Sequence, residues 1–167
     1  DFGLLGNGGT TSVESTSPIT PAGLESGVTV VVGAPLQMCA IVNEGVKCWG
    51  NANVGNGAAS ANVPTYAYNL RDSVSMISTN VPNGGYYNTC AIKNGAVYCW
   101  GYPEVSQTQS GSNIPVAIAG LDHDVTWVSS GERHACAIQG GQVKCWGYQN
   151  YGALGNNITT STISAPV

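Results

Sequence analysis

Six cysteines are the side chains whose spacing most clearly indicates chemistry. They form three pairs, each with eight residues between its members: Cys39 and Cys48, Cys90 and Cys99, and Cys136 and Cys145. Metal sites usually have two ligands two to four residues apart, and redox motifs read Cys-x-x-Cys; neither spacing occurs here. The pairs therefore predict three local disulfides, with buried free thiols and a metal site as the alternatives. Because disulfides persist in oxidising compartments, we expect an extracellular protein, secreted or at the cell surface.

The residues between paired cysteines predict β-hairpins. Asn94-Gly95 and Gly140-Gly141 accept positive φ at both central positions of a type I′ turn, and short apolar runs flank them. In this register Cys90 faces Cys99 at a non-hydrogen-bonded pair, where opposed Cα atoms lie about 4.5 Å apart, within reach of a disulfide. The first copy has Asn43-Glu44 followed by glycine, so a bulged hairpin is an alternative there.

Other patterns give little support for catalysis. No Gly-x-Ser-x-Gly elbow occurs, acidic residues are few and scattered, and the glycines at 6–9 lack the lysine of a phosphate loop. His134 aligns with Gln37 and Asn88, which predicts a structural hydrogen bond near the hairpin. Asp122-His123-Asp124 predicts a solvated turn, with a cation site as the alternative. We expect a non-enzymatic protein without a metal or other cofactor.

Composition restricts the classes of partner. Of the 167 residues only 8% are charged, against about 25% in a typical globular protein. A formal net charge of −4 with five lysines and arginines argues against binding to nucleic acid or to an anionic membrane surface. No apolar run approaches the roughly 18 residues of a membrane span.

Tryptophan follows the second cysteine of every pair. Adjacent strand residues point to opposite faces, so these side chains lie opposite the disulfides, where we expect packing in the core or between repeats: Trp49, Trp100 and Trp146. Three less regular aromatic residues are candidates for binding a partner: Tyr86, Tyr87 and Trp127. Asn157, in Asn-Ile-Thr, and Asn88, in the weaker Asn-Thr-Cys, are candidates for glycosylation.

The hairpins belong to a longer repeat of about fifty residues, a period typical of propeller blades and other arrays. Each copy has a proline, a leucine six residues later, a β-branched run, the hairpin and Trp-Gly. We expect one repeat domain over 1–167, with repeats at approximately 1–51, 52–102 and 103–148 and a partial repeat at 149–167. Both ends fall within a repeat and neither looks like a cap.

The third copy carries the fullest pattern: Gly120-Leu121, the run 125–129, Gly131, His134, Cys136-Ala137-Ile138, Val143, Cys145-Trp146-Gly147, Tyr151-Gly152 and Leu154-Gly155. This pattern resembles the regulator of chromosome condensation repeat, in particular its bacterial, cysteine-containing kind. The resemblance implies seven-bladed β-propellers of four-stranded antiparallel blades that serve as platforms for protein partners, some of them inhibiting secreted enzymes. The nucleotide-exchange role of one branch does not carry over, because this chain lacks a basic surface.

We therefore expect an all-β chain of four-stranded, antiparallel, propeller-like blades. The array is incomplete, since closure needs about four to eight blades. Because open sheet edges are rarely left bare, we predict a structural subunit that assembles with copies of itself, as a fibre or ring, through blade edges. The alternative is a segment of a seven-bladed propeller that binds or inhibits a protein partner. Glycans are a further expected attachment.

Overall fold

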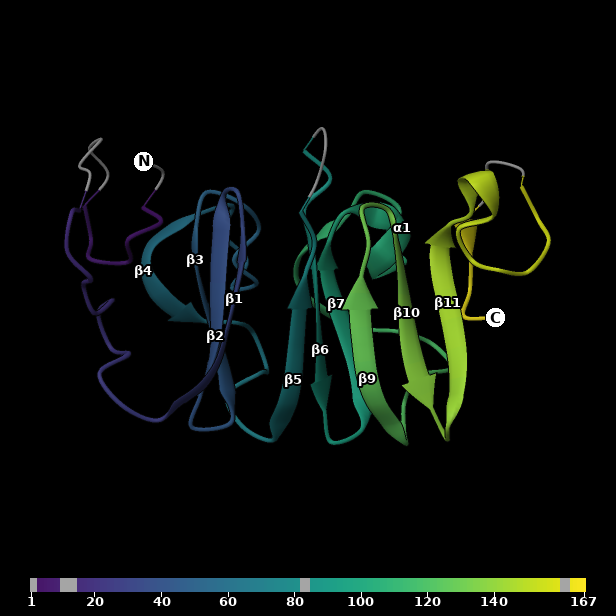
Figure 1. Ribbon diagram of the computed structural model, residues 1–167, viewed down its shortest axis with the longest axis horizontal. Helices are drawn as coiled ribbons and strands as arrows, with labels where there is room; N and C mark the ends of the chain where they lie inside the picture. Colours follow the sequence, from purple (N-terminus) through teal and green to yellow (C-terminus); the bar gives the residue numbers. More distant parts are fainter. Residues whose placement is uncertain (1–2, 10–14, 82–84, 160–162) are drawn as a thin grey trace.

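The computed structural model describes residues 3–9, 15–81, 85–159 and 163–167. Three four-stranded antiparallel sheets, called blades 1 to 3 here, stand in a row (Figure 1). Their strands are β1 (Val28–Ala34), β2 (Gln37–Val42), β3 (Gly45–Gly50) and β4 (Ala61–Tyr66); β5 (Val74–Thr79), β6 (Asn88–Lys93), β7 (Ala96–Gly101) and β8 (Ser112–Ala117); and β9 (Val125–Ser130), β10 (His134–Gln139), β11 (Gln142–Tyr148) and β12 (Ile163–Ser164).

Within each blade the strands pair in sequence order. Each blade takes its outer strand from the sequence repeat that follows its hairpin, so blades and sequence repeats are offset. The expected all-β class with four-stranded antiparallel blades is confirmed. Two short turns of helix, which the sequence did not predict, lie in the loops after β7 and β11: α1 (Pro103–Ser106) and η1 (Asn150–Gly152). None of the helices in the described ranges is long and apolar enough to cross a membrane.

The central strands of each blade form the predicted disulfide-linked hairpin. Opposed cysteines pair at Cα–Cα distances of 4.1, 4.1 and 4.0 Å in blades 1, 2 and 3, which confirms the three disulfides. The first hairpin has a two-residue turn and no bulge between its strands, since Val42 pairs with Gly45. Asn43 and Glu44 both adopt positive φ, 47° and 61°, as a type I′ turn requires.

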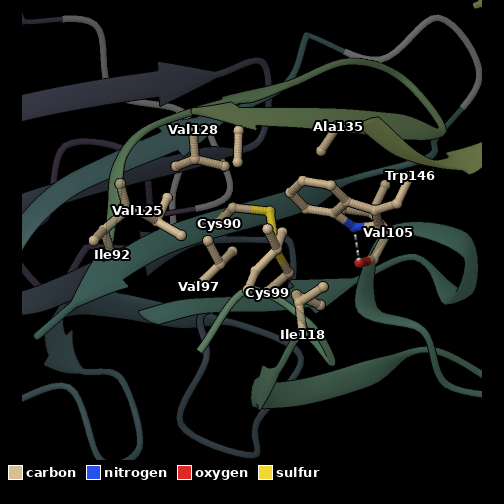
Figure 2. Close-up of a cluster of buried hydrophobic side chains, with 12 residues drawn as sticks. Cys90, Ile92, Val97, Cys99, Val105, Ile118, Val125, Val128, Ala135 and Trp146 are labelled. Carbon is tan, nitrogen blue, oxygen red and sulfur yellow. Dashed lines mark hydrogen bonds between the residues drawn. A yellow bond between two sulfur atoms is a disulfide. The ribbon is translucent and has the colours of Figure 1, made fainter. Parts of the chain in front are cut away.

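Apolar layers between neighbouring blades form the core. We call the side of a blade that faces the preceding blade its front face, and the other side its rear face. The rear face carries the disulfide, and the front face of the next blade carries the tryptophan (Figure 2). Between blades 2 and 3, the buried layer contains Cys90, Ile92, Val97, Cys99, Val105, Ile118, Leu121, Val125, Val128, Ala135, Ala137 and Trp146.

The tryptophan that follows the second cysteine of a pair donates a hydrogen bond that links its blade to the loop of the blade before it. Trp100 Nε1 donates to the carbonyl of Asn53 at 2.8 Å, and Trp146 Nε1 donates to that of Val105 at 3.0 Å (Figure 2). Both indoles are fully buried. Trp49 makes the same kind of bond, 2.8 Å long, to the carbonyl of Leu4. We call this contact the indole clasp; it pairs the N–H of a buried indole and fixes the loop of one blade on the next.

Replacing Trp100 with phenylalanine should destabilise the protein by about 2–3 kcal/mol, because it opens a cavity in the buried layer and removes the hydrogen bond that links the two blades. Urea unfolding with the disulfides intact measures this. The matched control is Trp127→Phe, at a side chain that is 55% exposed, which should change the stability by less than about 0.5 kcal/mol. Equal losses in the two variants would refute the role of the clasp.

The three disulfides should differ in their access to reductant. Those of blades 1 and 2 are fully buried, whereas Cys136 in blade 3 is half-buried and Cys145 is 8% exposed. Because thiol–disulfide exchange needs an accessible sulfur, mild reduction followed by alkylation and mass spectrometry should label Cys136 and Cys145 first. Simultaneous labelling of all six cysteines would contradict this order.

Candidate protein-binding surfaces

The front face of blade 1 exposes side chains whose equivalents are buried elsewhere. Val74 and Ile77 in β5 are 4% and 3% exposed, and the equivalent valines of β9, at 125 and 128, are 4% and 0% exposed. In β1 the same two positions are Val28 and Val31, which are 40% and 61% exposed. The sequence pattern is the same in all three strands, so the difference arises from the absence of a blade packed against this face.

A pocket lies between the front face of blade 1 and the residues that precede it. Its volume is about 670 Å³, and blade 1 contributes Val28, Val31, Met38, Ala40 and Trp49. The opposite wall consists of Leu4, Leu5, residues 15–21 and Leu24. The lining is largely apolar, so this pocket suits an apolar side chain or strand rather than a charged ligand.

The rear face of blade 3 is uncovered in the same way. Val143 is 67% exposed, whereas its equivalents Val46 and Val97 are fully buried. Trp127 is 55% exposed, whereas its equivalents Val30 and Met76 pack against the layers between blades. Both exposed apolar surfaces are therefore sheet faces, and contact through blade edges stays a prediction.

A cation–aromatic cluster joins blades 2 and 3. The Arg133 guanidinium carbon lies 3.9, 5.1 and 5.6 Å from the ring centres of Tyr148, Tyr86 and Tyr102. Arg133 also forms an ion pair with Glu104 of α1, which is 5% exposed. The hydrogen bond to this carboxylate is the main reason that the pKa of Arg133 is raised. Sequence reasoning missed Glu104 and Arg133, because only the fold brings together residues 29 positions apart.

The structure separates the three aromatic residues predicted to bind a partner. Tyr86 packs edge-to-face on Tyr102, with ring centres 4.6 Å apart, so it belongs to the cation–aromatic cluster. Tyr87 is half-buried and lines a pocket with Tyr102, Pro103 and the residues 110–113. Trp127 alone presents most of its side chain to solvent, on β9 in blade 3.

The polar position at the start of each hairpin serves the junction between blades. Gln37 donates to the Asn53 carbonyl at 2.9 Å and accepts from Thr89 of the next blade at 3.0 Å. Asn88 donates to the Glu132 carbonyl of the next blade at 2.9 Å. His134 is half-buried at the start of β10 in blade 3, and burial lowers the pKa of its imidazole.

The two predicted glycosylation sites lie in opposite environments. Asn157 is exposed in the loop before β12, with a φ of 62°. Asn88 is only 1% exposed, and its amide nitrogen is bonded to carbonyls of blade 3. A glycan on that nitrogen would break the junction between blades. Asn88 is therefore not a candidate for glycosylation in the folded protein.

Among the described residues, no group of three or more histidine, cysteine or acidic side chains is arranged so that it could hold a metal ion. His123 and Asp122 form an exposed pair, with Nδ1 and Oδ1 2.8 Å apart. The hydrogen bond from His123 lowers the pKa of Asp122. This pair occupies the turn before β9, so its environment is that of a solvated surface.

Replacing Glu104 with glutamine should destabilise the protein by about 2–3 kcal/mol, because it leaves Arg133 among aromatic rings without its counter-charge. Asp72→Asn is the matched control: it removes the carboxylate of an exposed ion pair with Lys93, 3.1 Å long, and should change little. Thermal unfolding of the two variants measures the difference. A loss no greater for Glu104→Gln than for Asp72→Asn would contradict a structural role for the cluster.

No protein-family model matches the chain, and no curated protein matches its sequence. Solved structures do match. The crystal structure of human WBSCR16 superposes with a TM-score of 0.75 and 20% identity, over 98% of this chain and 44% of that one. Prp20p from Saccharomyces cerevisiae, described with its binding to Gsp1p and histones, gives a TM-score of 0.65 and 16% identity, over 84% and 38%. Yeast RCC1 (Prp20) bound to Kap60 gives 0.62 and 16%, over 81% and 36%.

At these low identities, the superpositions show a shared fold alone. The chain spans less than half the length of the proteins it matches. Its blades form an open row rather than a closed ring, as the sequence predicted for an incomplete array. The chain therefore has the fold of part of an RCC1-like β-propeller, comprising three four-stranded blades.

Proposed function

We propose that this chain is a segment of a non-enzymatic β-propeller that binds a protein partner. The observation that carries the proposal is Trp127, a large aromatic side chain held 55% exposed on a rigid, disulfide-linked sheet. Exposed tryptophan on a rigid surface is typical of the residues that dominate protein–protein binding. The yeast protein of the same fold is recorded as binding Gsp1p, histones and Kap60, which supports a binding role of this general kind.

The proposal includes an oxidising, extracellular compartment. Three disulfides in a chain of 167 residues support it, since such bonds persist there. The exposed Asn157 sequon would be accessible to a glycan in that compartment. The paired cysteines also support the closer likeness to the bacterial kind of repeat.

The test is affinity enrichment from the secreted fraction of the source organism with the immobilised chain, followed by affinity measurement with the purified partner. Trp127→Ala should weaken binding at least about tenfold. Tyr68→Ala is the control, because Tyr68 is also 55% exposed but lies in the turn after β4. A partner that binds all three proteins equally would refute Trp127 as the binding residue.

A second candidate function is that of a structural subunit that assembles with copies of itself into a fibre or ring. The observation that favours it is the position of the two uncovered apolar faces, at opposite ends of the row of blades (Figure 1). A contact between two different faces of identical chains produces a ring when it closes and a filament when it does not.

A further inference from the structure

Residues 3–9 and 15–24 have the geometry of a segment that connects two blades. At the two internal junctions, the chain leaves an outer strand through a turn closed by bonds from Leu70 N to Ala67 O, 3.3 Å, and from Leu121 N to Ile118 O, 3.1 Å. The same turn occurs before blade 1, where Leu24 N donates to Pro21 O at 3.1 Å. This turn forms even though the described residues place no sheet in front of blade 1.

The loop at residues 3–9 also makes the backbone contact that the equivalent loop makes between blades 1 and 2. Gly8 N donates to Asn62 O at 3.0 Å, as Gly57 N donates to Asn113 O at 2.9 Å between blades 1 and 2. The indole clasp of Trp49 completes the likeness. The outer part of a preceding blade is therefore in position, while the described residues supply none of its three inner strands. The pocket in front of blade 1 marks their place.

The inner strands of blade 3 present backbone N–H and C=O groups of the kind that the missing strands in front of blade 1 would supply. At the internal junctions, Val46 N donates to Leu70 O at 2.7 Å and Val97 N donates to Leu121 O at 2.8 Å. The equivalent donor in blade 3 is Val143 N, which meets no such carbonyl among the described residues. The equivalent acceptor before blade 1 is the carbonyl of Leu24.

A second backbone bond recurs at both internal junctions. Val74 N donates to the carbonyl of the hairpin turn residue Glu44 at 2.9 Å, and Val125 N donates to that of Gly95 at 3.0 Å. The equivalent donor at the front of blade 1 is Val28 N, and the equivalent acceptor at the rear of blade 3 is Gly141 O. The two open ends of one chain thus present the two halves of the contact that the chain makes twice within itself.

We propose that two copies of this chain associate head to tail by strand exchange. The strands β9, β10 and β11 of one copy insert between residues 15–24 and blade 1 of a second copy. Val143 N then bonds to Leu24 O of the second copy, and Gly141 O accepts from its Val28 N. The inference deepens the second candidate function and rests on it.

In this contact, a segment of the second copy replaces the outer strand of blade 3. β12 has two residues, and beyond it Val167 exchanges two backbone hydrogen bonds of 3.0 Å with Cys145. Pro166-Val167 matches Pro18-Ile19 of the incoming segment in the repeat pattern, so residues 15–21 of the second copy take this place on β11. Pro21 lacks the N–H that Ala67 and Ile118 donate at the internal junctions. The contact therefore has one hydrogen bond fewer than those junctions.

The test uses two substitutions at exposed side chains, one on each face. Val31→Asp places a charge on the front face of blade 1, and Val143→Asp places one on the rear face of blade 3. Each should raise the dissociation constant for self-association at least about tenfold, as measured by sedimentation velocity over a range of concentrations. Val81→Asp is the control, because Val81 is 74% exposed in the loop after β5 and should leave association unchanged.

Mixing the two variants separates head-to-tail contact from other modes. Val31→Asp keeps an intact blade 3 face and Val143→Asp keeps an intact blade 1 face, so the mixture should form a one-to-one dimer and grow no further. Dimer formation also shows that both variants are folded. Oligomers that ignore both substitutions would overturn this mode of contact and leave self-assembly standing. A monomer at every concentration would overturn both, and would leave the partner-binding proposal untouched.

Discussion

The structure depends on the apolar layer shared by adjacent blades. A four-stranded sheet with two apolar faces cannot be stable in water alone, so each blade must cover a neighbour and be covered in turn. The layer joins the disulfide-linked hairpin of one blade to the tryptophan of the next. The indole clasp adds direction to this contact, because its donor lies on one blade and its acceptor on the loop of the other.

This dependence explains why the ends of the row differ from its interior. The same valine positions are buried where a neighbour exists and exposed where none does. Repeat proteins in general gain stability from nearest-neighbour contacts as well as from each repeat. The kinds of face that stabilise the interior of the row are therefore the ones left uncovered at its ends.

Few charges contribute to this architecture. Between described residues, lysine and arginine form ion pairs at Lys93–Asp72 and Arg133–Glu104, and only Glu104 is buried. Short hairpins closed by disulfides restrict the unfolded chain instead. Aromatic rings around Arg133 supply a further contact between blades that involves no second charge.

Local patterns in the sequence determined the hairpins and the disulfides. Turn dipeptides fix the register of two neighbouring strands, and the register fixes which cysteines oppose each other. The repeat period, together with the alternation along each strand, was sufficient for the all-β class and for the open, incomplete array.

Only the tertiary structure decided which of the equivalent residues are covered. Val143, Val46 and Val97 occupy the same position in the repeat, yet Val143 alone is exposed because none of the described residues forms a blade that covers it. The burial of Asn88, the pairing of Glu104 with Arg133 and the engagement of Tyr86 likewise arise at the junction of two blades. The physical reason is one of range: turns and strand registers follow from residues within about ten positions of each other, whereas burial depends on segments that the fold alone brings together.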